Sequence, residues 1–426
     1  MPTVDDHTLT GLLPHLVRSD SGWSANWRTV TLHSVFQPVL SITHRRVVGY
    51  EALLRAYDPI GTPISPETLF AATPSPVDAR ALDRLARCMH VANFVEQDID
   101  DNSWLFLNTR PQVFETSWPQ RAFIDELSAY FGVPQERIVI EVLEQPADDE
   151  AAVASMLAAS QPRDFLIAID DFGTGFSNFD RVWRFRPDIV KLDRSLIARA
   201  GKRDGDNSMI SHLISMLHQL GTMVLAEGIE TDDELMILMQ ADVDFVQGYW
   251  FGQPKPSVRA ASAQAPELIE SMWNKFTEYE RTHARHQRIG FEGLAETVLA
   301  GAETFAATGD LQLAAQTVFT FPEARRVFVT NSLGHQLKPS VTSPAAPPPP
   351  TRLAPLLPGT YSNWSRRTYF KHALAAPGRV AVMGPHRSLT DGEDCYTAAI
   401  ALERDGELNV FCVDFTPAAA IVLPAN

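Results

Sequence analysis

The stretch FLIAIDDFGTGFSNFDRV, residues 165–182, decides how this chain is expected to fold. Its first five residues are apolar, and two adjacent aspartates, Asp170 and Asp171, follow where a buried strand would end, just before a glycine-bearing loop. Neighbouring carboxylates repel each other, and near a core they are costly unless positive charge compensates them. Two interpretations follow: the pair binds a divalent cation, or it forms a structural turn with a helix cap.

Short apolar runs of this kind alternate with amphipathic helical segments from about residue 30 to residue 256. The runs are VFQPVLSI (35–42), VVGYEALLR (47–55), WLFLNTR (104–110), IVIEVLE (138–144), FLIAIDDF (165–172), DIVKLD (188–193), TMVLAEGI (222–229) and DFVQGY (244–249). Strands alternating with helices indicate parallel βαβ units, and eight runs favour a closed TIM-like (β/α)8 barrel over an open sheet. Because the first run precedes any helix, one barrel strand is expected to be irregular or antiparallel.

The rest of the chain is predicted to form further parts around this barrel. Residues 1–29 are assigned to an N-terminal extension, 30–258 to the barrel, 259–289 to a connecting helix and 290–426 to a smaller α+β domain. The connecting helix rests on apolar residues at helical spacing within 266–289. The proline-rich segment SPAAPPPPTRLAPLLP, 343–358, is predicted to be an extended internal loop or spacer.

Composition excludes several classes of function. The net charge of −16 argues against a general binder of polymeric nucleic acid, which needs a basic face. No apolar run is long enough for a transmembrane helix, and the acidic N-terminal segment is unlike a secretory signal, so we expect a cytoplasmic protein without a membrane span. The three cysteines, Cys88, Cys395 and Cys412, lack metal-ligand spacing and are interpreted as small buried hydrophobes.

Polar residues of metal-ligand type end almost every apolar run. They are Glu51, Asn108, Glu141, Asp170, Asp171, Lys191, Asp193, Glu227, Glu230 and Gln247. In a β/α barrel the carboxyl ends of the strands converge on the face that carries the active site. A ring of carboxylates with an amide oxygen is a hard-oxygen site suited to Mg²⁺ or Mn²⁺.

Each of these residues alone has a structural explanation. A single strand-end acid is more often a helix cap or a salt-bridge partner. Asn108 alone would be a turn residue, Lys191 a solvated strand end, and Gly173 and Gly175 ordinary loop glycines. The joint pattern on successive strands is hard to obtain from structural needs, so the metal-site interpretation is preferred.

Several ordered motifs resemble those of the EAL-domain phosphodiesterases that hydrolyse cyclic di-GMP. The motifs are EALLR (51–55), FLNTRP (106–111), IEVLE (140–144), DDFGTGFS (170–177), KLDRSLI (191–197), AEGIET (226–231) and QGYWFGQP (247–254). The resemblance covers roughly residues 30–256 and implies a barrel with an antiparallel first strand. Two departures, GFSN for the commoner GYSS and FLNTR for a serine-containing version, remove no ligand.

The resemblance also implies roles for single residues. It places two Mg²⁺ or Mn²⁺ ions on Glu51, Asn108, Glu141 and Asp170, with Asp171 bridging or supporting the second ion and Glu227 binding metal or positioning water. Lys191 would sit beside the nucleophilic water, so that Glu51, Lys191 and Glu227 form the catalytic set. The implied substrate contacts are Arg55, Gln247 and Asp193. The implied supports of the loop are Glu144, Glu230, Gly173 and Gly175.

The implied reaction is hydrolysis of cyclic di-GMP to linear pGpG. Two metals about 3.5–4 Å apart can polarise a phosphodiester and activate a water for in-line attack. Lys191 then serves either as base or as stabiliser of the oxyanion. In the family the DFGTG loop links the active site to a dimer interface, which implies a homodimer.

The C-terminal part resembles a Cache-like (PAS-related) sensor domain through short motifs. They contain Gly334, Trp364, Arg367, Tyr369, Phe370 and Asp414. One interpretation is a pocket for an unknown small ligand or partner, built on Arg367, Tyr369 and Asp414. The other is a packed module for dimerisation or spacing, with Trp364 and Phe370 in its core.

Three hypotheses for the whole chain follow. The first is a metal-dependent cyclic di-GMP phosphodiesterase regulated by a C-terminal sensor domain. The second is a cyclic di-GMP receptor that binds without hydrolysis and signals through partners. The third, an unrelated metal-dependent hydrolase on a similar barrel, is disfavoured by the ordered motifs.

Overall fold

A computed structural model describes residues 8–97, 102–109, 120–142, 165–173, 178–200, 206–346, 362–388 and 393–416. The chain divides into two compact units, Met1–Phe276 and Thr277–Asn426. The four-part division with boundaries at residues 29, 258 and 289 stays a prediction.

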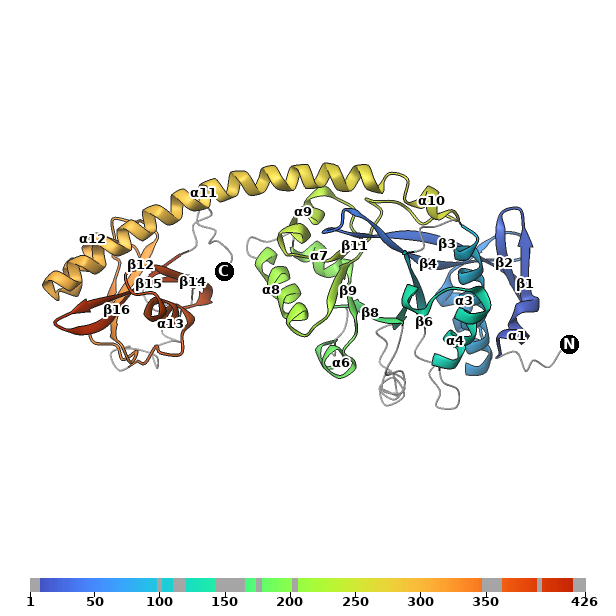
Figure 1. The fold of residues 1–426 in the computed structure, drawn as a ribbon, viewed down its shortest axis with the longest axis horizontal. Coiled ribbons are helices and arrows are strands. Elements are labelled where there is room, and N and C mark those ends of the chain that lie inside the picture. Colours follow the sequence, from blue (N-terminus) through green and yellow to red (C-terminus); the bar gives the residue numbers. More distant parts are fainter. Residues whose placement is uncertain are drawn as a thin grey trace. The chain divides into compact units, whose positions relative to one another are not determined.

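Eight strands of the first unit close into a barrel (Figure 1). In hydrogen-bonding order they are β3 (Val30–Ser41), β11 (Phe245–Val246), β10 (Met223–Ala226), β9 (Ile189–Leu192), β8 (Leu166–Phe172), β7 (Ile138–Val142), β6 (Trp104–Thr109) and β4 (Arg46–Tyr57). The pairing of β3 with β4 completes the ring. Strand β3 is antiparallel to both of its neighbours, and the other pairs are parallel. The predicted barrel with an antiparallel first strand is confirmed.

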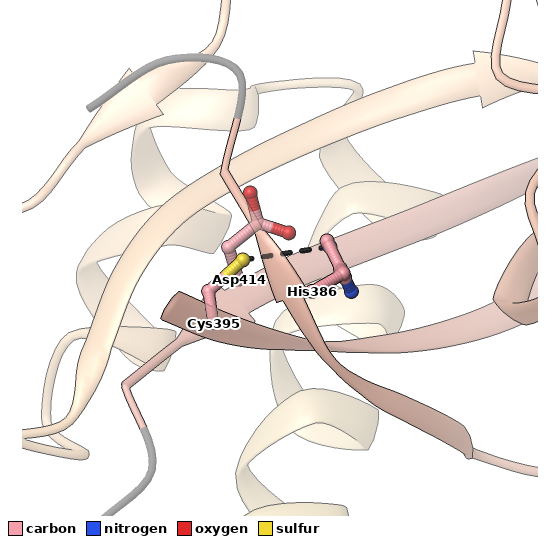
Figure 2. A group of neighbouring side chains, drawn as sticks. All are labelled: His386, Cys395 and Asp414. Carbon is pink, nitrogen blue, oxygen red and sulfur yellow. Dashed lines mark hydrogen bonds between the residues drawn. The ribbon is translucent and has the colours of Figure 1, made fainter. Parts of the chain in front are cut away.

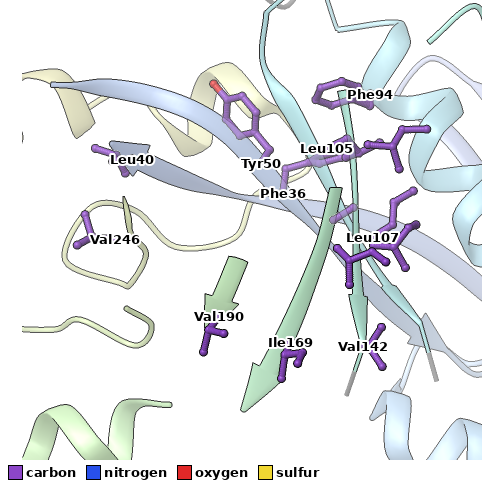
Figure 3. Close-up of a cluster of buried hydrophobic side chains, with 14 of the residues drawn as sticks. Phe36, Leu40, Tyr50, Phe94, Leu105, Leu107, Val142, Ile169, Val190 and Val246 are labelled. Atoms are coloured by element: carbon purple, nitrogen blue, oxygen red, sulfur yellow. The ribbon is translucent and has the colours of Figure 1, made fainter. Parts of the chain in front are cut away.

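Alternation along the barrel strands separates two apolar layers. Side chains on the outer face join a large cluster with the surrounding helices, and Figure 3 shows Leu105 of this cluster beside Phe94 of helix α3 (Pro76–Val95). Side chains on the inner face form a smaller cluster that fills the barrel. Its buried members are Val39, Phe106, Val139, Ala168, Ile189, Leu225 and Phe245. Because successive strand residues point to opposite faces, both layers come from the same short apolar runs.

The other elements of the first unit surround the barrel or extend its sheet. They are α1 (Leu9–Leu12), η1 (Leu13–His15), β1 (Leu16–Ser19), β2 (Gly22–Trp27), β5 (Pro63–Ile64), α2 (Pro66–Ala71), α4 (Gln120–Phe131), η3 (Gln135–Arg137), α6 (Asn178–Phe185), α7 (Arg194–Ala200), α8 (Asp206–Gln219), α9 (Asp232–Gln240) and α10 (Val258–Ala261). The β1–β2 hairpin adds two antiparallel strands to β3 outside the ring. Residues of the predicted N-terminal extension therefore take part in the barrel's sheet.

Helix α11 (Ala265–Thr308) is longer than the helix predicted over 266–289. Four residues beyond that range, Leu294, Val298, Ala302 and Phe305, are buried at helical spacing in the core of the second unit. The helix extends beyond residue 289 because its own stripe of apolar residues extends to Phe305 and is buried in that core.

The second unit is built on an antiparallel five-stranded sheet. Its strands, in sheet order, are β13 (Val341–Thr342), β12 (Ala324–Asn331), β16 (Glu407–Phe415), β15 (Asp394–Arg404) and β14 (Ala381–Arg387). One face packs against α11 and α12 (Leu311–Val318), and the other packs against α13 (Thr368–Ala375). Both Trp364 and Phe370 lie in the core on the α13 side.

Within the described residues, no helix combines the length and apolar character needed to cross a membrane. All three cysteines are described and buried, and they form no disulfide.

The close contact at Gly248 generates a test of the barrel's packing. A Cβ atom on Gly248 would lie 2.1 Å from the backbone oxygen of Ile229 and 2.3 Å from its nitrogen. Neither atom can move away without breaking the hydrogen bonds of that segment to Gln247 and Trp250. We expect Gly248→Ala to lower the free energy of unfolding by about 3 kcal/mol, the upper range for overpacking.

Urea unfolding followed by tryptophan fluorescence measures this effect, because all of the eight tryptophans except Trp364 belong to the first unit. The matched control is Gly293→Ala in α11, where a Cβ meets no heavy atom of the described residues within 4 Å. Because Gly293 belongs to the second unit, this control is expected to leave the fluorescence-detected unfolding of the first unit unchanged. Equal stability of both variants would contradict the close contact at Gly248.

Candidate active site

Most of the predicted strand-end residues lie on the inner face of the barrel, directly beyond its apolar filling. Several follow a member of the inner cluster by two positions: Asn108 after Phe106, Glu141 after Val139, Asp170 after Ala168, Lys191 after Ile189, Glu227 after Leu225 and Gln247 after Phe245. Because the side-chain period of a strand is two, each polar residue shares the face of the apolar one before it. The apolar layer thus supports a polar layer at the carboxyl ends of the strands.

Lys191 lies at the centre of this polar layer. Its Nζ is 2.5 Å from Glu227 Oε1, 2.6 Å from Glu141 Oε1 and 3.1 Å from Asp170 Oδ1. Glu51 Oε1 is farther, at 3.8 Å. The Lys191 side chain is 1% exposed and Glu141 is fully buried. One buried ammonium therefore faces four carboxylates.

Amide side chains hold Glu51 in place. Asn108 Nδ2 donates to Glu51 Oε1 at 2.9 Å, and Gln247 Nε2 donates to Glu51 Oε2 at 2.6 Å. Gln247 Nε2 also lies 3.2 Å from Gln37 Oε1, on the strand opposite Glu51. Gln37 was not among the site residues predicted from the sequence. The polar residue within the apolar run VFQPVLSI was the available signal.

The two adjacent aspartates are explained by a β-bulge. The pairing of β8 with β9 shifts register between Ile169 and Phe172, and Asp171 has a φ of 57°. The bulge breaks the strict alternation of the strand, so Asp171 joins Asp170 near the site while Phe172 still packs in the outer core. Asp171 N donates to Asp170 Oδ1 at 3.0 Å.

The surplus of buried negative charge shifts several pKa values. Burial raises the pKa of Glu227 to about 8 against the opposing effect of Lys191. Burial, followed by the charge of Glu51, raises the pKa of Glu141 well above its usual range. Burial and the charge of Asp170 likewise raise the pKa of Asp171. The raised pKa values favour the protonated, uncharged forms of these three carboxyl groups.

The pKa values of Glu51 and Lys191 are shifted in the directions that favour their charged forms. Burial alone would raise the pKa of Glu51, but Lys191, Asn108 and Gln247 outweigh it and hold the pKa below its usual value. Burial would lower the pKa of Lys191, but the surrounding carboxylates, led by Asp170 and Glu141, raise it well above its usual value. Lys191 is therefore protonated at neutral pH.

The arrangement fits divalent cations. Two groups of carboxylates have their ligand atoms within 4.8 Å of one another: Glu51, Glu141 and Glu227, and then Asp170, Asp171 and Glu227. Glu227 belongs to both groups. Within the described part of the chain, Glu141 Oε2 and Gln247 Oε1 are buried without a hydrogen-bond partner. Such orphaned acceptors are costly unless a cation or ligand satisfies them, and carboxylate oxygens are what Mg²⁺ and Mn²⁺ prefer.

Arg55 lies at the edge of the same face. It borders a cavity of about 240 Å³ whose wall includes Glu51, Asn108 and His90. Its Nη1 donates to the backbone oxygen of Leu54 at 2.9 Å, and no carboxylate of the described residues pairs with it. The guanidinium is thus available to an anion in this cavity.

Other predicted site residues have structural partners instead. Asp193 accepts a hydrogen bond from Ser195 N at 2.9 Å and so caps the start of α7. Glu230 forms two hydrogen bonds of 2.5 Å with Arg194. Gly173 has a φ of 112° and contacts Leu196, so a side chain there would be strained. Glu144 and Gly175 lie outside the described residues.

The predicted C-terminal pocket is brought together only in part. Arg367 and Tyr369 border a cavity of about 220 Å³ with Met383 and His386. Asp414 is not part of that wall. It accepts hydrogen bonds from Arg326 Nε at 2.9 Å and from Thr397 Oγ1 at 2.6 Å.

Comparison with known proteins identifies the family. The model of the EAL domain matches residues 24–254. The chain belongs to the EAL domain family. The matched range contains the whole barrel and every predicted residue of its polar layer.

Two curated relatives from Escherichia coli (strain K12) are named as probable cyclic di-GMP phosphodiesterases. PdeD is 30% identical over 228 residues, which cover 52% of this chain and 41% of PdeD. PdeN is 28% identical over 226 residues, which cover 52% of this chain and 43% of PdeN. The chain thus spans less than half the length of these relatives.

A solved structure shares the fold over most of the chain. It is the Bacillus subtilis YkuI protein, with an EAL domain, in complex with substrate c-di-GMP and calcium. The TM-score is 0.73, the identity is 19%, and the match covers 90% of this chain and 94% of that one. The EAL-type barrel followed by a small antiparallel sheet domain therefore has an experimental counterpart.

The excess of buried carboxylates predicts how the stability of the first unit depends on pH. Glu227 has a raised pKa in the folded protein, so its stabilising contribution is complete below about pH 4.5 and is lost as pH rises toward 8. With chelator present, we expect the free energy of unfolding of the first unit to fall by about 1 kcal/mol per pH unit between pH 5 and 8. Saturating Mg²⁺ should oppose this loss because a cation favours the ionised carboxylates.

The variant Glu227→Gln should show a shallower slope in chelator. The control Glu278→Gln removes a carboxylate that is 75% exposed on α11 and should keep the slope of the wild type. Tryptophan-detected urea unfolding at each pH gives the comparison. If the free energy of unfolding depends on pH equally in wild type and in Glu227→Gln, the raised pKa of Glu227 is contradicted.

Proposed function

We propose that the chain is a metal-dependent phosphodiesterase that hydrolyses cyclic di-GMP to linear pGpG. The observation that carries the proposal is the pair of carboxylate groups that share Glu227 around the buried ammonium of Lys191. The substrate is proposed from the names of the E. coli relatives, because no feature of the site alone selects one cyclic dinucleotide.

The proposed metal ligands are the residues of the two overlapping groups together with Asn108. Since Asn108 donates its amide nitrogen to Glu51, its carbonyl oxygen is left as the ligand atom. Mg²⁺ or Mn²⁺, when bound, would supply charge that neutralises the carboxylates and Lewis-acid polarisation of a phosphoryl oxygen. Glu51 is held by two amides, so its carboxylate is oriented before any ligand arrives.

The environment of Lys191 supports an electrostatic role over a role as general base. Its neighbours hold its pKa well above the usual value, so it would seldom be deprotonated at neutral pH. We infer that the ammonium donates hydrogen bonds to negative charge that develops as water attacks phosphorus and the 3′-oxygen leaves. Glu227, whose pKa burial raises to about 8 before any metal binds, is proposed to orient the attacking water or to bind metal.

Arg55 and Gln247 are proposed to contact the substrate. The Arg55 guanidinium borders the cavity that Glu51 and Asn108 also line, which suits a phosphate group. Gln247 presents a buried Oε1 without a partner among the described residues. Asp193 and Glu230 are proposed as supports, since one caps α7 and the other holds Arg194.

The test of the function is conversion of cyclic di-GMP by the full chain with Mg²⁺ or Mn²⁺, followed by chromatography of the nucleotides. We expect pGpG to accumulate and chelator to prevent it. Glu141→Gln and Lys191→Met should each lower kcat more than about 100-fold, because each removes charge from the centre of the site. Glu278→Gln is the matched control and should retain the wild-type rate.

Binding measured in the same samples separates hydrolase from receptor. Tight binding of cyclic di-GMP without conversion at saturating Mg²⁺ and Mn²⁺ would overturn the proposal in favour of a receptor. If the protein neither binds nor converts cyclic di-GMP, this nucleotide is not its substrate.

We propose further that residues 30–258 form the catalytic part, and that residues 290–426, joined through 259–289, form a Cache-like regulatory part of a homodimer. The cavity beside Arg367 and Tyr369 supports a small ligand there. We expect Arg367→Ala to change kcat/KM for cyclic di-GMP at least about threefold, although this residue belongs to the other unit. The metal-induced shift in thermal unfolding of the barrel should be unchanged.

Sedimentation of the full chain reports the oligomeric state. Unchanged kcat/KM in Arg367→Ala would argue against regulation through this cavity, and a fully active monomer would argue against the homodimer.

A further inference from the structure

A second group of ligand-type side chains lies in the C-terminal unit. His386 on β14, Cys395 on β15 and Asp414 on β16 come from three adjacent strands and gather on one face of the sheet (Figure 2). They are called the His–Cys–Asp cluster below. No part of the proposed phosphodiesterase chemistry uses them.

The backbone brings these three residues to one face through a β-bulge. Met383 pairs with Thr397, but the register then shifts so that His386, rather than Pro385, pairs with Cys395. Gly384 makes the bulge possible, because it has a φ of 153° and a Cβ there would lie 2.9 Å from the Tyr396 Cα. Without the shift the imidazole would point to the opposite face.

The contacts within the cluster are short and polar. His386 Nε2 is 3.4 Å from Cys395 Sγ and 3.2 Å from Thr397 Oγ1. Thr397 donates to Asp414 Oδ1 at 2.6 Å, and Arg326 donates to Asp414 Oδ2 through Nε and Nη2. Asp414 Oδ1 therefore keeps a lone pair toward the cluster, while Oδ2 is taken by Arg326.

We propose that the His–Cys–Asp cluster binds a late first-row divalent cation of the Zn²⁺ type. Its ligand atoms all lie within 4.8 Å of one another. Tetrahedral bonds of the usual Zn–N and Zn–S lengths place neighbouring ligand atoms about 3.4–3.8 Å apart. The 3.4 Å between His386 Nε2 and Cys395 Sγ matches that spacing.

The chemistry of the donors sets this cluster apart from the barrel. The barrel offers carboxylate and amide oxygens, which suit hard cations such as Mg²⁺ and Mn²⁺. The cluster offers imidazole nitrogen, thiolate sulfur and one carboxylate oxygen, a combination that suits Zn²⁺ or Co²⁺. The two sites should therefore select different metals, and the inference does not depend on the proposed function.

The burial of the cluster and its access to a cavity suit a metal ion with one exchangeable coordination position. Cys395 and Asp414 are each 4% exposed, whereas His386 borders the cavity of about 220 Å³. A fourth ligand can approach from this cavity. Binding converts the Cys395 thiol to a thiolate and releases its proton to solvent. Because Arg326 already balances Asp414, the bound ion keeps one uncompensated positive charge, which favours an anionic fourth ligand.

Ligation by the Cys395 sulfur gives a direct spectroscopic test with Co²⁺ as the probe. Full-length protein is first saturated with Mg²⁺ and then titrated with Co²⁺ while near-ultraviolet absorption is recorded. We expect a thiolate-to-cobalt charge-transfer band that reaches its limit at one equivalent and disappears on addition of Zn²⁺. Co²⁺ in the barrel cannot give this band, because that site has no sulfur ligand.

Matched variants assign the band. Cys395→Ser should abolish it, and His386→Ala should weaken Co²⁺ binding at least about tenfold. Cys412→Ser is the control: Cys412 is fully buried on the same sheet, and the band should persist. Absence of the band in wild type, or its survival in Cys395→Ser, would overturn the proposal and leave the cluster as packed core. His386→Ala keeps the test decisive if Cys395→Ser does not fold.

Discussion

The constraint on which the barrel's site depends is the burial of one ammonium among too many carboxylates. Lys191 is 1% exposed and contacts Glu141, Glu227 and Asp170, with Glu51 just beyond. One positive charge cannot compensate this many buried negative charges, so several carboxyl pKa values rise. Lys191 alone therefore does not compensate the four carboxylates around it, and a divalent metal would supply further positive charge.

The barrel can hold this unfavourable charge because the layer beneath it is apolar and closed. Inner-face residues such as Val139, Ala168 and Ile189 fill the barrel two positions before the polar ring. They fix the strand ends at close spacing and exclude water from below, which strengthens every electrostatic interaction above them. The bulge at Asp171 is the local exception to alternation, and it adds a carboxylate that a regular strand would turn away.

How much of this could be predicted from the sequence depends on the range of the interactions. The barrel and its strand-end residues follow from periodicity and order along the chain, which are local signals. Gln37 was missed because it interrupts an apolar run on the antiparallel strand, where no strand-end rule applies. Asp414 was placed in a pocket, yet it pairs with Arg326, 88 positions away. Such pairing is set by sheet geometry and leaves no local signal. The register shift that turns His386 toward Cys395 is marked in the sequence only by Gly384 and Pro385 within the strand.

The polar layer of the barrel and the His–Cys–Asp cluster balance their buried charges in opposite ways. In the barrel, four carboxylates face the single ammonium of Lys191, so the excess negative charge favours binding of cations. In the C-terminal sheet, Arg326 matches Asp414, and the cluster is balanced until the Cys395 thiol loses its proton. A cation there must therefore gain its affinity from sulfur and nitrogen bonds rather than from surplus charge. Hard cations gain little from such donors, so the balance at Arg326 makes the second cluster selective for softer metals.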